Sequence, residues 1–103
     1  MGVKLLAMGS YLPEKIMTND DFAKFLDTND EWIRTRTGIT QRHMAGWEPV
    51  SYMGKKAAEK AIEKAGISPK DIGLVIVSTV TSDFVTPSIA SLLQYELGIE
   101  NAA

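Results

Sequence analysis

The fold of this chain is decided by residues 51–80, which read SYMGKKAAEKAIEKAGISPKDIGLVIVSTV. The first half predicts a helix over residues 51–65, because apolar side chains recur at helical spacing and Gly66 follows as a C-terminal cap. Residues 72–80 predict a strand without polar alternation, which is typical of a strand covered on both faces. A helix followed by a buried strand indicates a layered α/β fold.

The rest of the chain divides into short elements at its glycine, proline and capping residues. Two strands of the buried type make a poor sheet alone, so the sequence predicts part of a larger α/β unit. The other expected elements are, in order, a strand over 4–8, a helix that begins with Asn19 as its N-cap and carries Phe22, Phe25 and Leu26, a helix over 30–35 ended by Gly38 with an Asp30–Arg34 ion pair, an extended segment over 39–44, and a helix opened by Pro87 and Ser88 and ended by Gly98.

The composition is that of an ordinary globular domain, with 103 residues, 45% hydrophobic and 23% charged. The net charge of −2 gives no general attraction for nucleic acid or for anionic lipid. No apolar run is long enough to span a membrane and no targeting signal is visible, so a cytoplasmic location is expected. The absence of cysteine excludes disulfides, thiolate metal sites and a cysteine nucleophile within these residues.

Trp32 and Arg36 form the first candidate site. They are four residues apart, so on a helix they project from one face. An indole face beside a guanidinium suits a planar, anionic ligand such as a nucleotide, because the ring stacks on the base and the arginine binds phosphate. The alternative is structural: Trp32 packs the helix against the core, and Arg36 forms a surface ion pair.

Two other groups of residues carry weaker indications. His43 is the only histidine, and with no cysteine or clustered acids at ligand spacing it predicts a structural or surface role, with no metal site. The hydroxyl-rich residues 78–82 follow the expected buried strand, where sites often lie. Their hydroxyls serve equally well to satisfy local backbone groups.

Several short motifs together resemble the N-terminal part of β-ketoacyl-acyl-carrier-protein synthase III, of the thiolase-like superfamily. The resemblance spans nearly the whole chain and implies an α/β fold, an incomplete N-terminal part of the thiolase-like layered αβαβα arrangement. The Trp-bearing block is specific to this type of synthase. The motifs are GSYLP at 9–13, Thr18-Asn19, DTNDEWI at 27–33, RTGI at 36–39 with Arg42, STVT at 78–81, and Pro87-Ser88 with Gln94 and Leu97-Gly98.

The resemblance implies an acyltransferase. Such synthases start fatty-acid synthesis by condensing a short acyl-coenzyme A with malonyl-acyl carrier protein, releasing carbon dioxide. A cysteine is acylated first, and a histidine and an asparagine then stabilise the charge left by decarboxylation. The resemblance implies a homodimer when intact, no tightly bound cofactor, and coenzyme A thioester as substrate.

The resemblance also assigns roles to particular residues. Trp32 and Arg36 match positions that contact coenzyme A, Thr28 lies near the adenine, and Thr37 matches the mouth of the substrate channel. Thr86 matches a position that borders the acyl pocket, reached across the dimer interface. It replaces what is often a bulkier apolar residue, so either the choice of acyl primer changes or the loop repacks and the choice stays the same.

Two other features depart from the family. Gln41 stands where the family usually has an acid before Arg42, which puts a local ion pair there in doubt. The catalytic cysteine follows soon after the segment that matches residues 97–103, and the catalytic histidine and asparagine come later, so His43 matches neither. Residues 1–103 are therefore expected to be the N-terminal portion of a synthase domain, truncated before the cysteine, with no catalytic residue and inactive alone.

Two alternatives to the synthase remain open. The chain is a non-catalytic module that binds coenzyme A or pairs with a complementary polypeptide, or it belongs to a thiolase-like synthase that makes polyketide or quinolone precursors. A sheet with so few strands is also expected to expose an apolar edge, and the chain to be partly folded or aggregating unless it is joined to something.

Overall fold

The structure is a computed structural model that describes residues 2–103. These residues divide into two compact units. The smaller unit is Leu12–Trp47, and the larger combines residues 2–11 with Glu48–Ala103. Each unit has its own helices and its own packing, and each is described separately below.

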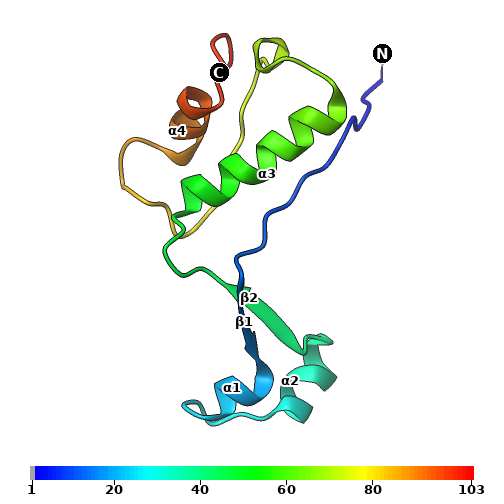
Figure 1. Cartoon of the computed structure of the whole chain (residues 1–103), viewed down its shortest axis with the longest axis vertical. Helices are drawn as coiled ribbons and strands as arrows, with labels where there is room; N and C mark the ends of the chain where they lie inside the picture. Colours follow the sequence, from blue (N-terminus) through cyan, green and yellow to red (C-terminus); the bar gives the residue numbers. More distant parts are fainter. Residues whose placement is uncertain (1) are drawn as a thin grey trace. The chain divides into compact units, whose positions relative to one another are not determined.

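The smaller unit is a two-stranded antiparallel ribbon with two short helices between its strands (Figure 1). Strand β1 spans Lys15–Thr18 and pairs with β2, Gln41–Met44, so that Thr18 lies opposite Gln41. The expected extended segment at 39–44 is confirmed as a strand over its last four residues, β2. Strand β1 was not expected from the sequence.

Helix α1 spans only Asn19–Ala23 and begins through a capping box. The Thr18 hydroxyl accepts from the Asp21 N–H, and the Asp21 carboxylate accepts from the Thr18 N–H at 2.9 Å. The expectation that Asn19 is the N-cap is therefore wrong, since Thr18 fills that position. Phe25 also lies beyond the end of this helix and is exposed.

Helix α2 spans Asp30–Thr37 and has a well-formed cap at each end. The side chain of Asn29 accepts from the Trp32 N–H at 2.8 Å, and Gly38 ends the helix in the left-handed region at a φ of 72°. The expected helix with its glycine stop is confirmed, as is the ion pair of Asp30 with Arg34 at 3.2 Å.

The larger unit contains helix α3, Val50–Ala65, the short 3₁₀ turn η1, Pro69–Asp71, and helix α4, Ile89–Glu96. The start of α3 has no side-chain cap of its own at Pro49. The carboxylate of Asp83 supplies one, because it accepts from the backbone N–H groups of Val50 at 2.8 Å and Ser51 at 3.2 Å. The expected helices here are confirmed to within two residues at each end.

Small residues let the larger unit pack closely on both sides of α3. On one side the backbone at Gly9 lies directly against the helix at Ala57 and Ala61. On another, Gly54 faces Leu93 of α4, which is buried. The alanine-rich stripe of this helix therefore has the close-packing role that its composition indicates. The core of the unit is formed by Ile89, Leu93 and Ile99.

The expected strands at 4–8 and 72–80 are not strands in the described chain. Both segments are extended, but a strand requires a hydrogen-bonded neighbour along its length. For residues 72–80 the structure has only two such bonds, because Ala103 donates to the carbonyl of Gly73 and accepts from Val75. The expected burial on both faces is also wrong, since Ile76 is 81% exposed and Val80 fully exposed.

Candidate functional site

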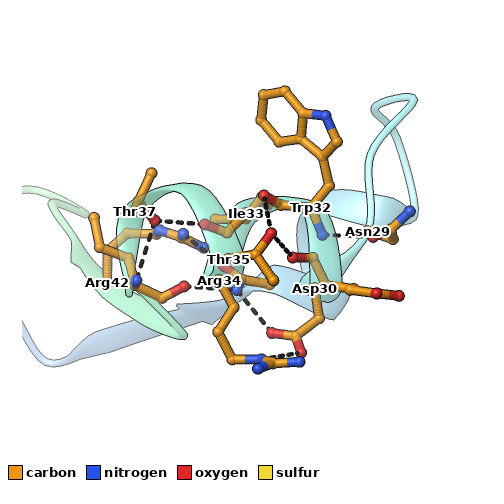
Figure 2. Close-up of polar contacts among 11 residues, drawn as sticks. Asn29, Asp30, Trp32, Ile33, Arg34, Thr35, Thr37 and Arg42 are labelled. Carbon is orange, nitrogen blue, oxygen red and sulfur yellow. Dashed lines mark hydrogen bonds and ion pairs between the residues drawn. The ribbon is translucent and has the colours of Figure 1, made fainter.

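Helix α2 brings Trp32 and Arg36 together on one face. The guanidinium carbon of Arg36 lies 4.4 Å from the centroid of the Trp32 ring, a cation–π contact between residues one turn apart. Trp32 is 52% exposed, and its indole projects away from the Asp30–Arg34 pair (Figure 2). This exposure argues against Trp32 as a residue that packs the helix against a core. An aromatic surface with a positive charge beside it remains open to solvent.

A hollow of about 470 Å³ lies beside this surface and is lined by Leu26, Asp27, Thr28, Asn29 and Trp32. It joins the turn before α2 to the first turn of the helix. Thr28 and Trp32, two of the residues expected to bind the ligand, therefore share one concave surface. The lining includes Asn29, whose side-chain oxygen already accepts from the Trp32 N–H.

Thr37 is the last residue of α2, and its hydroxyl forms hydrogen bonds with the backbone there. Its hydroxyl donates to the Ile33 carbonyl at 2.7 Å and accepts from the Ile39 N–H at 3.0 Å, as Figure 2 shows in part. These bonds help to end the helix at Gly38, and the hollow's lining does not extend to Thr37. The structure thus brings Trp32, Arg36 and Thr28 together and places the Thr37 hydroxyl in a structural role.

Thr86 belongs to the larger unit, where it is exposed and precedes Pro87 through a cis peptide bond. The same loop contains Asp83, whose carboxylate caps α3. Hydrogen bonds to Ser51 and to the Val50 N–H hold the pKa of Asp83 below its ordinary value, because they favour the ionised carboxylate.

The buried amide of Asn19 is a feature of this unit that the sequence does not predict. Asn19 is only 1% exposed, and its side-chain amide donates at 2.8 Å to both Asp30 and the Ile39 carbonyl. Its oxygen accepts from Arg42 at 2.7 Å. An asparagine at a helix start predicts an N-cap, so nothing local in the sequence indicates that this one is buried.

The ion pair that Gln41 puts in doubt would have involved Arg42. In the structure Arg42 makes other contacts instead. Besides its bond to Asn19, it donates to the Met17 carbonyl at 3.2 Å and lies 4.4 Å from the Phe22 ring centroid. Arg42 thus links the two strands to α1. No acidic partner at position 41 is needed for these contacts.

Two carboxylates of this unit, Asp30 and Asp21, are held in their ionised form by hydrogen bonds. The Asn19 amide, followed by Arg34, lowers the pKa of Asp30 from its ordinary value. The Thr18 N–H, followed by Lys24 and the Thr18 hydroxyl, lowers the pKa of Asp21 to about 2. Both carboxylates therefore serve as acceptors within the fold, and neither is poised as a general acid near neutral pH.

His43 contacts the carbonyl of Pro13 through Nδ1, which agrees with the structural role expected for it. Over residues 2–103 no group of three or more His, Cys, Asp or Glu side chains is placed to hold a metal ion. Within the same residues no helix is both long enough and apolar enough to cross a membrane.

Comparison with known proteins gives a consistent result in sequence. No family model matches the chain. The chain is 59% identical over 102 residues to the β-ketoacyl-[acyl-carrier-protein] synthase III of Rickettsia rickettsii (strain Sheila Smith), covering 98% of this chain and 32% of that protein. It is 52% identical over 99 residues to the enzyme of the same name from Acholeplasma laidlawii (strain PG-8A), covering 96% and 32%.

Solved structures agree with the sequence comparison. A 3-oxoacyl-[acyl-carrier-protein] synthase III from Aquifex aeolicus VF5 superposes with a TM-score of 0.91 at 42% identity, covering 98% of this chain and 33% of that one. The priming β-ketosynthase of the R1128 polyketide biosynthetic pathway gives a TM-score of 0.89 at 40% identity, covering 97% and 30%.

The chain spans about a third of the length of the curated relatives it matches. The comparison therefore covers nearly all of this chain but only about a third of each relative. Within that part, sequence identity and fold point to the same proteins. The expected resemblance is confirmed: over nearly all of its residues this chain is similar to about a third of a β-ketoacyl-[acyl-carrier-protein] synthase III, which has the thiolase-like α/β fold.

Proposed function

We propose that residues 1–103 are the N-terminal portion of a β-ketoacyl-acyl-carrier-protein synthase III domain. The whole protein would join a short acyl-coenzyme A primer to malonyl-acyl carrier protein with loss of carbon dioxide, the first condensation of fatty-acid synthesis. The identity of 59% to a synthase III of this name and the TM-score of 0.91 to another support this proposal. It further includes a homodimer, a cytoplasmic location and no tightly bound cofactor.

Within this function, the proposed role of the smaller unit is to bind coenzyme A. The observation that carries it is the exposed Trp32 ring with the Arg36 guanidinium 4.4 Å from its centroid. The ring offers a stacking surface for the adenine, and the guanidinium offers paired donors for phosphate. Thr28 would lie near the adenine, in the hollow that it lines with Trp32. Thr37 and Thr86 are proposed, respectively, for the channel mouth and the acyl pocket.

Titration with coenzyme A tests this role. Because base–aromatic stacking is worth about 1–3 kcal/mol, Trp32→Ala should weaken binding by roughly 5- to 150-fold. Arg36→Ala removes a charge-assisted bond of about 1.5–3 kcal/mol and should weaken it by roughly 10- to 100-fold. Isothermal titration calorimetry measures both effects without relying on the fluorescence of Trp32, which the first variant removes.

The matched control for the charge is Arg34→Ala. Arg34 lies on the same helix and carries the same charge, but its guanidinium pairs with Asp30. Since exposed ion pairs contribute little, this variant should bind coenzyme A within about threefold of the unchanged protein. If Arg34→Ala and Arg36→Ala weaken coenzyme A binding equally, the effect comes from net charge alone, and the assignment of Arg36 fails.

A second candidate is a synthase that primes polyketide assembly. The similarity to the R1128 priming β-ketosynthase, at 40% identity, favours it specifically. Both candidates use the same proposed coenzyme A surface, so binding does not separate them. Condensation assays of the whole protein with acyl carrier proteins from fatty-acid and polyketide systems do, because only the true partner should give rapid turnover.

The 103 residues contain no cysteine. The chain alone is therefore predicted to have no condensing activity, because the acyl-enzyme step of such synthases forms on a cysteine thiolate. Incubation with acetyl-coenzyme A, followed by intact mass spectrometry, should leave its mass unchanged. Stoichiometric acetylation would contradict the prediction and favour a different nucleophile.

A further inference from the structure

The most buried polar side chain of the smaller unit is Asn19, and both the nitrogen and the oxygen of its amide are hydrogen-bonded. The two N–H groups have two acceptors, and the oxygen has one donor. Asn19 is 1% exposed, less than the apolar core residues of the larger unit. A buried amide is costly unless it is fully paired, so a completely paired one indicates a defined structural task.

Both N–H groups of this amide act on helix α2. One donates to the carboxylate of Asp30, the first residue of the helix, and the other to the carbonyl of Ile39, just after the residue that ends it. Both distances are 2.8 Å. The helix has eight residues and is far shorter than one that is stable alone in water. Its caps determine where it begins and ends, but they do not orient it.

The other side of Asn19 is held by the strand pair. Its oxygen accepts from Arg42 of β2, its backbone N–H donates to the Thr40 carbonyl at 3.1 Å, and Arg42 also donates to Met17 of β1. Asn19 is thus fixed by two hydrogen bonds, to Arg42 and to the Thr40 carbonyl, and Arg42 is itself bonded to β1. Its amide N–H groups, which donate to Asp30 and to the Ile39 carbonyl, therefore connect the two ends of α2 to this fixed residue.

We propose that Asn19 is a positioning residue for the Trp32–Arg36 surface. Its two N–H groups attach both ends of α2 to the strand pair and so determine where the aromatic ring and the guanidinium point. This inference rests on the proposed coenzyme A role of that surface. Asn19 touches no ligand in this arrangement and acts only through α2.

The most direct test is Asn19→Asp in the full chain. The substitution keeps the size of the side chain and an oxygen to accept from Arg42, but it removes both donors. Loss of two hydrogen bonds should raise the exchange rates of the α2 backbone amides by about tenfold or more, measured by hydrogen exchange without ligand. The amides of β1 and β2 should change much less. The dissociation constant for coenzyme A should rise by about fivefold or more.

A polarity swap separates positioning from general damage. In the double variant Asn19→Asp/Asp30→Asn, the amide at position 30 can donate to the new carboxylate, so the bond re-forms in the reverse direction. Slower α2 exchange and tighter coenzyme A binding than in Asn19→Asp are expected. Thr18→Ala is the matched control, since it removes the α1 cap beside Asn19 without touching the donors. It should lower the melting temperature but leave α2 exchange and coenzyme A binding nearly unchanged.

The outcomes distinguish this inference from the proposed function. If unchanged protein binds no coenzyme A, the proposed function fails, while α2 exchange still decides whether Asn19 holds the helix. If Asn19→Asp leaves α2 exchange unchanged, the positioning role is overturned whatever the binding result. If Asn19→Asp is largely unfolded, recovery in the double variant supports the role, and lack of recovery overturns it.

Discussion

Single side chains in the smaller unit act mainly as acceptors and donors that complete the backbone. Thr18 and Asp21 form the capping box of α1, and Asn29 caps α2. Asn19 satisfies a helix terminus and a strand residue at once. Trp32 differs from these, because its side chain is 52% exposed and its ring lies 4.4 Å from the guanidinium of Arg36. At this scale the polar residues have structural tasks, and the Trp32–Arg36 surface is left free to bind.

The capping role of Asp21 predicts a dependence of stability on pH. Its pKa falls from the ordinary 3.8 to about 2 in the folded protein. A lowered pKa means that the ionised carboxylate stabilises the folded state above pH 3.8, and that this stabilisation is lost as the pH falls toward 2. Acid titration of the unfolding free energy should therefore show a decline in this window. Asp21→Asn should be less stable at neutral pH and show a smaller decline; an identical pH profile would contradict this.

Helices in this chain depend on contacts beyond their own ends to different degrees. Helix α2 has both caps within its own sequence, at Asn29 and Gly38. Helix α3 has Gly66 at its C-terminus, but its N-terminus is capped by Asp83, 33 residues further along the chain. The loop with Thr86 is therefore attached to α3 through that carboxylate.

The closest approach within the larger unit makes Gly9 sensitive to substitution. A Cβ at this position would lie 2.7 Å from the Ala61 nitrogen and even closer to the Ala57 carbonyl oxygen. Because both are backbone atoms of α3, the segment or the helix would have to move. Gly9→Ala should destabilise the protein by about 1–3 kcal/mol in urea unfolding. Gly73→Ala is the matched control, since a Cβ there meets nothing within 4 Å, and an equal loss in both would refute the packing argument.

The molecule as a whole exposes unusually many large apolar side chains. In the larger unit these lie mainly on the two extended segments, and they are Val3, Leu5, Leu6, Met8, Leu74, Ile76 and Val80. Exposed apolar groups on extended backbone with unpaired hydrogen-bonding groups favour pairing with another chain. The 103-residue chain is therefore expected to associate or to bind a hydrophobic dye.

Substitutions in the second segment test this expectation. Ile76→Asp replaces an exposed apolar group with a charge and should reduce association, measured by size-exclusion chromatography with light scattering. Ser78→Asp adds the same charge to the same segment without removing an apolar group, and should reduce it less. A monomer with a sharp, reversible melt in the unchanged chain would disprove the expectation.

Helices α2, α3 and α4 were predictable because most of their determinants are local. Gly38 and Gly66 end α2 and α3 where the sequence predicts, since only a glycine readily adopts the left-handed conformation there. The Trp32–Arg36 pair was predictable for the same reason, because residues one turn apart on a helix must share a face. Thr28 joins them because it lies just before the same helix.

The sequence by itself thus determined the positions of α2, α3 and α4, the glycine ends of α2 and α3, and the side chains that α2 presents together. Only the tertiary structure decided that β1 pairs with β2, that Asn19 is buried rather than a cap, and that residues 72–80 have just two strand-type hydrogen bonds, both with Ala103. The physical reason is the range of the interactions. Capping and helical spacing act over a few residues, whereas strand pairing and burial require partners that the fold brings from distant parts of the chain.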